Sequence, residues 1–555
     1  GLKGIPSIIS HSYYHGFNGV NEGAYRPVVL INMAIETQLW GNNPGVAHFF
    51  NVLFYALSCV LLFVFLRKLF KDNGYTLPLI ITLLFTAHPI HTEVVANIKS
   101  RDEILCFLFI VLTLNLLLKY VSNKKPVYLI LSIICYFLGL VTKEYGLTLA
   151  GVIPVMLYIF SDKRIKTIIY LTIPYCLTAL FYLMLRSSIL DNMAFEKEMD
   201  VINNSLVAAN SYSERIATAV SILGKYIVLL VFPHPLSFDY SFNQIPIVNW
   251  SNFKAVLSLL MYLGLIIFSV IGITKKDPVA FCIVFYLFTL LLVSNLFVDI
   301  GATLAERFLF IPSMGFCIAV VILLSKITGY NPLSGNNKRT FYGIIAVVLI
   351  SCSFKTIDRN KDWKNNLTLF TADVQACPNS ARTHFSLASA LNNLASIEAN
   401  PVKRTQMLQK ALIGFRKSIE IYPEFSAAWY NMGVAYYSMG NQEEAMKAYQ
   451  KTIALNPGDK QALNNLGVIY FNSKDYTEAL KYFQEAVKQN PSFGDPYANI
   501  GAVYHNQGDY DNAIIYYNKA LLFNANNKNV LSNLSKLYRN MGDEEKANYY
   551  SNLAK

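Results

Sequence analysis

Adjacent ionisable residues stand at the ends of several apolar segments, and their types suit anion binding and proton transfer. The pairs are Arg101–Asp102, Lys143–Glu144 and Glu306–Arg307. Arginine offers planar, multidentate donors to an anion, lysine supplies a point charge, and a carboxylate can accept a proton as a general base. Charges kept beside lipid are costly and are functional candidates by default. The same pairs would also serve as structural ion pairs that anchor helix ends, and the sequence leaves both interpretations open.

Two other groups of polar residues could bind a ligand. His88, His91 and Glu93 are spaced by three and two residues, a pattern that resembles part of a metal site. Pro89 lies between the histidines and disfavours the continuous helix that would put both imidazoles on one face, so we predict no metal there. Asp239, in the run PHPLSFDYS, either contacts an acceptor substrate or caps a turn.

The composition divides the 555 residues into two parts. The chain is 54% hydrophobic and 15% charged, with a mean hydropathy of +0.35, whereas a soluble domain is about 25% charged. Residues 1–357 hold 26 Lys+Arg and 17 Asp+Glu, and residues 358–555 hold 21 and 18. The first part is therefore membrane-like and the second soluble-like. The net charge of +12 does not indicate a nucleic-acid partner, because most of the excess lies beside apolar segments.

Ten apolar runs approach the roughly 20 residues that a helix needs to cross a bilayer. They cover residues 46–66, 77–95, 103–121, 127–142, 146–160, 166–186, 251–273, 279–298, 306–325 and 340–357. Each must be helical, because lipid offers the backbone no hydrogen-bonding partner. Residues 216–232 are also apolar, but a crossing there would put Lys275 and Lys276 outside, so we interpret this stretch as re-entrant or interfacial.

Positive residues give the orientation of these runs. They follow alternate runs at Arg67, Lys68, Lys71, Lys119, Lys124, Lys125, Lys163, Arg164, Lys166, Lys275, Lys276, Lys326, Lys338 and Arg339. The positive-inside rule makes those loops cytoplasmic. The ten crossings then begin and end outside, which places residues 358–555 on the non-cytoplasmic face. The ionisable pairs described above fall on the same face.

A 34-residue period begins after residue 378. Pro423, Pro457 and Pro491 mark it. Small residues align at Gly433, Gly467, Gly501, Ala445, Ala479 and Ala513, and aromatic residues at Tyr449, Phe483 and Tyr517. This pattern is typical of tetratricopeptide repeats, in which small residues let paired helices approach and aromatics fill the seam. We predict about five repeats over 381–555, forming a superhelix with a concave face. The first, 381–423, has an insertion around 396–406, and 358–380 form a connecting helix or linker.

Six runs in chain order resemble one known family. They are AYRPVVLINMAI, FTAHPIHTEVVANIKSRDEILCFLF, GLVTKEYGLTLAG, YIVLLVFPHPLSFDYS, ERFLFIPSMGFC and RNKDWKNNLTLF. Together they resemble the transmembrane and tetratricopeptide-repeat-containing O-mannosyltransferases. The resemblance implies an all-α protein: a polytopic transmembrane domain of the C-type glycosyltransferase fold, followed by the repeats. It further implies transfer of mannose, or a related hexose, from a polyprenyl- or dolichyl-phosphate donor to Ser or Thr hydroxyls of a polypeptide bound by the repeats, without a cofactor.

The resemblance also gives roles to individual residues. The cations expected at the donor phosphate are Arg26, Lys99, Arg101, Lys143 and Arg307. The carboxylates that could act in catalysis are Glu93, Asp102 and Glu144, and further candidates are His88, His91, Asp239 and Glu306. The family's acidic catalytic motif follows a first transmembrane helix. Residues 1–45 look like the remainder of that first outer loop, and their only acids, Glu22 and Glu36, do not match the motif. We therefore expect the main base to precede residue 1.

The competing function is a membrane-anchored scaffold whose repeats recruit partner proteins without catalysis. A tether would need only one or two spans and no charged outer loops, so the composition favours an enzyme. A transporter is disfavoured, because the spans show no internal repeat. We expect a multi-pass membrane protein with its repeats in the bacterial periplasm, since Lys and Asn are abundant, or in the endoplasmic reticulum lumen if the source is eukaryotic.

Overall fold

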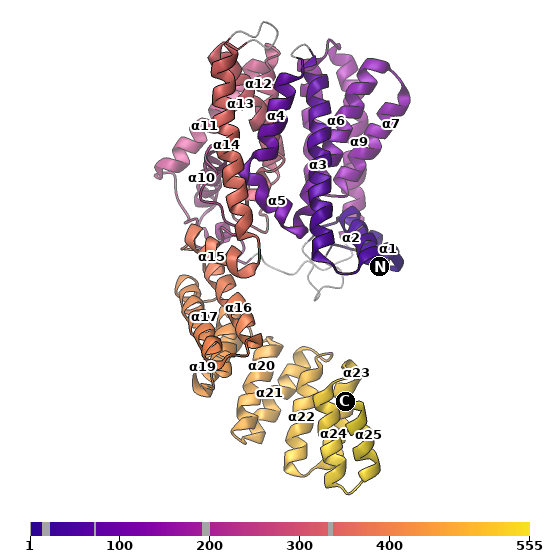
Figure 1. The fold of residues 1–555 in the computed structure, drawn as a ribbon, viewed down its shortest axis with the longest axis vertical. Coiled ribbons are helices and arrows are strands. Elements are labelled where there is room, and N and C mark those ends of the chain that lie inside the picture. Colours follow the sequence, from indigo (N-terminus) through magenta and orange to yellow (C-terminus); the bar gives the residue numbers. More distant parts are fainter. Residues whose placement is uncertain (1, 14–22, 72–73, 191–199, 331–336) are drawn as a thin grey trace. The chain divides into compact units, whose positions relative to one another are not determined.

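The computed structural model describes residues 2–13, 23–71, 74–190, 200–330 and 337–555. Within these ranges the secondary structure is helical, without a strand. The helices form two compact units, residues 1–379 and 380–555 (Figure 1). The predicted all-α class is therefore confirmed, and the second unit begins where the repeats were expected to begin.

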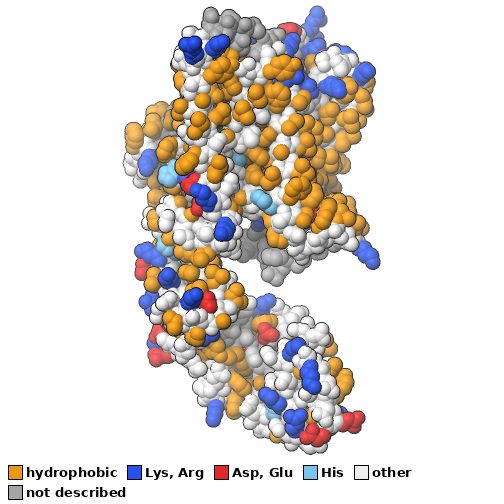
Figure 2. Space-filling view, in the orientation of Figure 1, with side chains coloured by type: hydrophobic (Ala, Val, Ile, Leu, Met, Phe, Trp, Pro, Cys, Tyr) orange, Lys and Arg blue, Asp and Glu red, His pale blue; other side chains and the backbone are white. Residues whose placement is uncertain are grey.

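Among the residues that the structure describes, five helices of the first unit are long and apolar enough to cross a membrane. They are Pro44–Leu69 (α3), Ile98–Asn123 (η4 and α6), Ile165–Leu190 (α9), Phe253–Thr274 (α11) and Lys338–Asp362 (α14). In the apolar 18-residue stretch of each helix, only 22% is buried inside the protein for α11 and only 11% for α14. Large exposed apolar side chains cover the surface of this unit (Figure 2). A surface of that kind needs lipid or another apolar partner.

The other predicted spans are shorter helices. They are Pro126–Leu140 (α7), Glu144–Thr148 with Leu149–Phe160 (η5 and α8), Pro278–Leu291 (α12) and Ser313–Thr328 (α13). The predicted span 77–95 is broken into Thr76–Ala87 (α4), Pro89–His91 (η3) and Thr92–Ala96 (α5), with a bend of 52°. Pro89 explains the break, because proline cannot donate a backbone hydrogen bond and clashes with the preceding turn. Each predicted span thus contains a helix, and whether every one crosses the bilayer stays a prediction.

Helices also occupy the segments expected to lie outside the ten spans. Residues 1–45 contain Leu2–Gly4 (η1), Ile5–Ser10 (α1) and Pro27–Trp40 (α2). The stretch interpreted as re-entrant is part of Tyr212–Val231 (α10), a single helix that packs against α11. Asn366–Ala376 (α15) follows α14 and leads toward the repeats. The short turn Ser205–Ala208 (η6) precedes α10. Within the predicted span 306–325, the turn Glu306–Leu309 (η7) precedes α13.

The second unit consists of paired helices. They are Ala381–Ile397 (α16), Pro401–Ile421 (α17), Ser426–Ser438 (α18), Gln442–Leu455 (α19), Lys460–Asn472 (α20), Tyr476–Gln489 (α21), Gly494–Gln507 (α22), Tyr510–Phe523 (α23), Lys528–Asn540 (α24) and Glu544–Leu553 (α25). The insertion near 396–406 is not an extended connection, because it lengthens α16 and α17. Only residues 398–400 separate the two helices, and the Asn400 side chain caps α17 with Pro401 in its first turn.

Candidate functional site

Arg26 joins two carboxylates that come from distant parts of the chain. Its guanidinium lies 2.7 Å from Asp102 Oδ2 and 3.0 Å from Glu144 Oε2. Arg26 directly precedes α2, Asp102 lies in the first turn of α6, and Glu144 begins η5. The Arg26 and Glu144 side chains are 21% and 25% exposed, whereas Asp102 is 8% exposed. The predicted ionisable residues thus form one network, which solvent reaches through Arg26 and Glu144.

Lys143 extends this network into the protein interior. Its ammonium lies 3.0 Å from Asp102 Oδ2 and 2.6 Å from Glu103 Oε1. Glu103 is completely buried, and its second oxygen has no hydrogen-bond partner among the described residues. The prediction from sequence gave Glu103 no role in the site, although it directly follows Asp102. Because Glu103 is buried and contacts Lys143, it is better placed to position that lysine than to contact a substrate.

Arg307 and Glu93 form a second ion pair near the first. Arg307 donates to Glu93 Oε1 from its guanidinium at 2.7 Å and to Oε2 from its backbone N–H at 3.0 Å. Glu93 is buried, whereas the Arg307 side chain is 28% exposed. Burial of Arg307 lowers its pKa. The negative charges of Glu93, Glu103 and Asp102 outweigh this effect and hold the pKa of Arg307 above its ordinary value. This coupling joins both ion pairs into one electrostatic cluster. We call Arg26, Glu93, Asp102, Glu103, Lys143, Glu144 and Arg307 the charge network.

Arg101 lies in a different environment from its neighbour Asp102. Its fully buried guanidinium donates to Glu36 at 2.6 Å, to Asn32 and Asn51 at 2.8 Å, and to the Ala47 carbonyl at 2.7 Å. These partners lie on α2 and α3, so Arg101 fastens the start of α6 to both helices. The structural interpretation of Arg101 is the one that its contacts favour. Glu22, the other acid of the first loop, lies outside the described residues.

The two histidines are engaged in hydrogen bonds at both ring nitrogens. His88 Nε2 lies 2.9 Å from the Leu230 carbonyl, and its Nδ1 accepts the Ile90 N–H. His91 contacts the Tyr55 hydroxyl at 3.0 Å and Ser313 Oγ at 2.8 Å. Both rings are buried, and their contacts hold the broken span against α10, α3 and α13. Over the described ranges, no group of three His, Cys, Asp or Glu residues could hold a metal ion.

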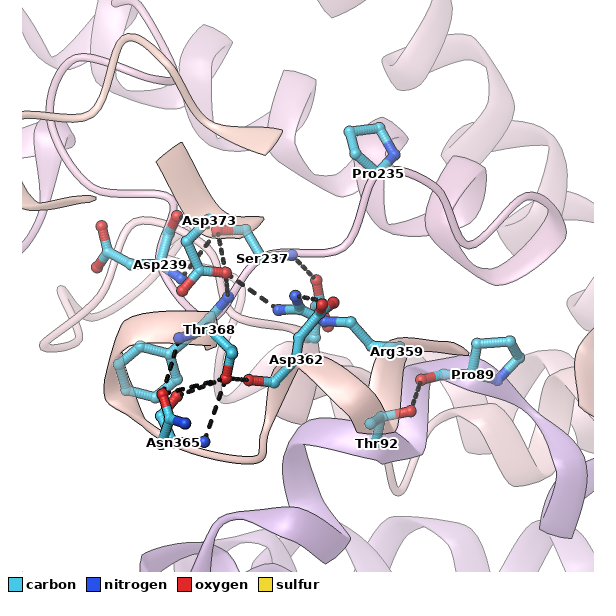
Figure 3. Close-up of polar contacts among 12 residues, drawn as sticks. Pro89, Thr92, Pro235, Ser237, Asp239, Arg359, Asp362, Asn365, Thr368 and Asp373 are labelled. Atoms are coloured by element: carbon cyan, nitrogen blue, oxygen red, sulfur yellow. Dashed lines mark hydrogen bonds and ion pairs between the residues drawn. The ribbon is translucent and has the colours of Figure 1, made fainter. Parts of the chain in front are cut away.

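A second buried polar cluster surrounds the loop after α10 (Figure 3). Glu306 accepts hydrogen bonds from the Ser237 N–H and, at 2.7 Å, from the Tyr240 hydroxyl. Burial raises the pKa of Glu306 to about 8; the positive charge of Arg359 opposes this rise and Glu93 adds to it. Glu306 lies in η7, before α13 begins. Its neighbour Arg307 belongs to the charge network, so the turn η7 connects this loop to the network.

Asp373 of α15 holds the same loop from the other side. It accepts from the Phe238 N–H at 3.0 Å and from Arg359 at 3.1 Å, and Figure 3 shows it between Arg359 and Ser237. Arg359 and Asp373 are buried and were missed from the sequence, although Arg359 begins the run RNKDW. Asp239 accepts from the backbone and side chain of Ser241, which is the turn-capping geometry. Lys99 lies exposed just before α6.

Comparisons with known proteins match both units. Residues 25–190 match the family described as dolichyl-phosphate-mannose-protein mannosyltransferase, and residues 408–460, 430–493 and 495–527 match tetratricopeptide repeats. The mouse protein O-mannosyl-transferase TMTC3 is 26% identical over 76% of this chain and 47% of its own length. The human TMTC1 is 26% identical over 74% and 49%, and the Caenorhabditis elegans F38B6.6 is 27% identical over 67% and 51%.

This chain therefore spans about half the length of the curated relatives that it matches. Solved structures align with less of it. A crystal structure of MamA is 23% identical, covers 28% of this chain and 93% of its own, and has a TM-score of 0.25. A structure of YrrB, titled as a TPR protein with an unusual peptide-binding site, is 20% identical, covers 33% and 90%, and has a TM-score of 0.27.

Proposed function

Because the chain joins a region of the dolichyl-phosphate-mannose-protein mannosyltransferase family to tetratricopeptide repeats, we propose that it is a membrane glycosyltransferase. It moves mannose, or a related hexose, from a polyprenyl- or dolichyl-phosphate donor to Ser or Thr hydroxyls of proteins. The reaction takes place at the non-cytoplasmic face, and the repeats bind the acceptor. The side of the membrane is argued from the positive-inside rule.

The charge network is the observation that carries this proposal. Its three cations, Arg26, Lys143 and Arg307, converge from three separated segments. A lipid-linked phosphate brings negative charge that grows when the bond between the sugar's anomeric carbon and the phosphate oxygen breaks. Fixed cations stabilise the leaving phosphate, and they need no reorganisation at that moment. Arg26 and Arg307 are exposed enough to reach the donor, and Lys143 adds charge behind them. We leave Arg101 out of this set, because its buried guanidinium already donates four hydrogen bonds within the protein.

The same transfer needs an acceptor for the hydroxyl proton. As the hydroxyl oxygen bonds to the anomeric carbon, its proton passes to a carboxylate and the phosphate leaves with the bonding electron pair. Glu144 is the most exposed carboxylate of the network, at 25%, whereas Asp102, Glu93 and Glu103 are buried. We propose that Glu144 faces the reacting groups.

Sugar transfer by the full chain in nanodiscs tests the proposal. The assay supplies polyprenyl-phosphate or dolichyl-phosphate mannose and a Ser/Thr-containing acceptor, and mass spectrometry measures the sugar added to the acceptor. We expect transfer by the wild type and its loss in Arg307→Ala. Arg215→Ala is the control, because Arg215 pairs with Asp299 outside the charge network. Failure of the wild type with both donors would favour the scaffold function, and equal transfer by Arg307→Ala would refute the assigned phosphate site.

A further inference from the structure

Helix α17 of the first repeat differs in charge from the corresponding helices of the later repeats. It carries five cations and a single carboxylate, Glu420. By contrast, α19 and α21 each carry two lysines and two glutamates, and α23 carries one residue of each sign. The charges of α19 and α21 pair with each other, as in Glu444–Lys447 and Glu478–Lys481. An excess of positive charge on the second helix is therefore a property of the first repeat.

Three lysines form a row along the exposed side of α17. Lys403, Lys410 and Lys417 are spaced by seven residues, and all three are exposed. Seven residues are nearly two turns of an α-helix, so the lysines lie along one side of α17 with about 10 Å between neighbours. The buried Leu408 and Phe415 lie on the opposite side of the helix. The lysine row therefore faces away from the core of the repeat.

Little negative charge within the protein compensates this row. Lys417 lies 3.0 Å from Glu420, but Lys403 and Lys410 form no ion pair with any residue that the structure describes. Glu398, in the turn before α17, accepts the Asn400 N–H at 2.9 Å. Two of the three lysines thus keep their charge available for a partner outside the chain.

Part of the lysine row belongs to the insertion of the first repeat. Helix α19 begins at Gln442, and the equivalent position one period earlier is Leu408, so residues 401–407 are additional turns at the start of α17. Lys403 lies in these turns beside Val402, which is 66% exposed. Ile413 is exposed to the same extent and lies three turns further along the same side. The exposed side of α17 therefore combines a lysine row with two aliphatic side chains.

This combination suits an acidic polypeptide better than a lipid bilayer. A helix that binds a bilayer surface buries a broad apolar face in the headgroup region, often with aromatic residues. The apolar face of α17 is already buried within the repeat, around Leu408 and Phe415. In the fully described α17, the large apolar side chains that are exposed are Val402 and Ile413 alone. Charge is therefore the main feature that the exposed side offers to a partner.

We propose that the exposed side of α17 binds an acidic polypeptide segment. Carboxylates about 10 Å apart meet all three lysines together, as on a helix with Asp or Glu at every seventh residue. A single exposed ion pair contributes little, so binding depends on the whole row. Val402 and Ile413 pack against small apolar residues beside the carboxylates. This surface lies outside the charge network, and the inference does not rest on the proposed function.

Fluorescence anisotropy tests this inference with the full chain in nanodiscs of phosphatidylcholine, a lipid without net charge. The probes are a labelled, helix-stapled peptide as long as α17 with three Glu residues spaced by seven, a version with the three Glu residues side by side, and a version with Lys in their place. We expect the spaced acidic peptide to bind about tenfold more tightly than either other peptide. Its affinity should fall as NaCl rises from 50 to 500 mM. Equal binding of the three peptides, or an affinity that salt does not change, would overturn the inference.

Variants of the lysine row test the residues. Lys403→Gln, Lys410→Gln and Lys417→Gln combined should weaken binding of the spaced acidic peptide about tenfold. The combined Lys→Glu changes at the same three positions should turn the preference toward the Lys peptide, which a merely structural role would not do. The matched control removes three exposed lysines from α19 and α21, by Lys451→Gln, Lys481→Gln and Lys488→Gln, and should bind like the wild type. Equal losses in this control and in the first variant would show that overall charge, rather than the row, attracts the peptide. Circular dichroism verifies that each variant keeps its helices.

A flotation assay examines the bilayer as the alternative partner. The same nanodiscs are mixed with vesicles of phosphatidylglycerol, an anionic lipid, and we expect the wild type and the triple Lys→Gln variant to float to the same extent. Flotation that depends on the three lysines, in a protein that does not bind the acidic peptide, would overturn the inference in favour of an anionic membrane surface.

Discussion

Arg307 is fixed to Glu93 at two points, by its guanidinium at 2.7 Å and by its own backbone N–H at 3.0 Å. The backbone contact sets the position of the turn η7, and the side-chain contact sets the direction of the guanidinium. Only one of the five guanidinium N–H donors is needed for that contact. The remaining donors, on a side chain that is 28% exposed, are thus positioned in advance for an anion.

Substitution of Arg307 should separate its charge from its geometry. We expect Arg307→Ala to lower kcat/KM for the lipid-phosphate donor about 100-fold or more, as for removal of a donor that stabilises developing charge. Arg307→Lys should keep part of the activity, because an ammonium supplies the charge without the fork of donors. Steady-state kinetics with varied donor concentration measure both. A lysine variant no better than the alanine variant would show that charge alone is not what the site requires.

Loss of Lys143 should destabilise the first unit. Lys143→Met leaves the buried Glu103 without a cation and Asp102 with Arg26 alone, and breaking such a buried pair costs about 3–5 kcal/mol. We expect a lower melting temperature in detergent and partial recovery in Lys143→Met combined with Glu103→Gln, which removes the stranded charge. Lys326→Met, at an exposed pair with Asp277, should melt like the wild type. Unchanged melting of Lys143→Met would mean that the network is not held together by this lysine.

Arg101 and Arg307 should fail in different ways. Arg101 is buried and donates four hydrogen bonds, so Arg101→Ala should lower the yield of folded protein and the melting temperature. Any folded fraction should bind the donor with a KM close to that of the wild type. Arg307→Ala should instead lose transfer and lower the melting temperature less, because Glu93 keeps its hydrogen bond from the backbone N–H of residue 307. A well-folded Arg101→Ala with a raised donor KM would return Arg101 to the phosphate site.

The repeats could be predicted from sequence because their packing is local. Gly467 and Phe483 stand 16 residues apart, and the same small–aromatic contact recurs at Gly433 with Tyr449 and at Gly501 with Tyr517. The 34-residue period of these glycines and aromatic residues therefore predicts their contact from the sequence alone. The insertion in the first repeat could not be placed, because Asn400 and Pro401 start a new helix within it and residue counting treats the extra residues as a loop.

The charge network could be predicted only as a list of residues. Arg26 contacts carboxylates 76 and 118 residues away, and Arg307 contacts one 214 residues away. Sequence neighbours Arg101 and Asp102 face different partners, because successive residues of a helix point about 100° apart. From the sequence, both residues could be identified only as charges beside a span, and their different partners could not be predicted. Glu103 was given no role, and Arg359 and Asp373 were missed, because the burial of these three residues follows from packing between distant helices.

Glu306 should give stability a dependence on pH. Its pKa is about 8 in the folded protein and near 4.5 ordinarily. Between these values the unfolded chain loses the proton that the folded protein keeps, so the free energy of unfolding decreases as pH rises from about 5 to 8. Glu306→Gln stays neutral and can still accept from Tyr240. Its melting temperature should therefore fall less than that of the wild type across this range. Melting curves in detergent at pH 5, 6, 7 and 8 test this, with the exposed Glu478→Gln as control, and parallel curves for Glu306→Gln and wild type would contradict it.

Gly467 should tolerate a side chain poorly, like the equivalent glycines Gly433 and Gly501, which also face an aromatic ring. A Cβ there would lie 2.6 Å from the Phe483 ring, because α20 and α21 pack directly against each other at this point. Overpacking of this kind typically costs about 1–3 kcal/mol, so Gly467→Ala should lower the protection of α20 and α21 in hydrogen exchange. Phe483→Leu in the same chain relieves the clash and should recover part of that protection. Gln461→Ala, on the exposed side of α20, should leave exchange unchanged. Equal protection in Gly467→Ala and wild type would mean that the ring can move aside, and that the spacing of the two helices does not depend on this glycine.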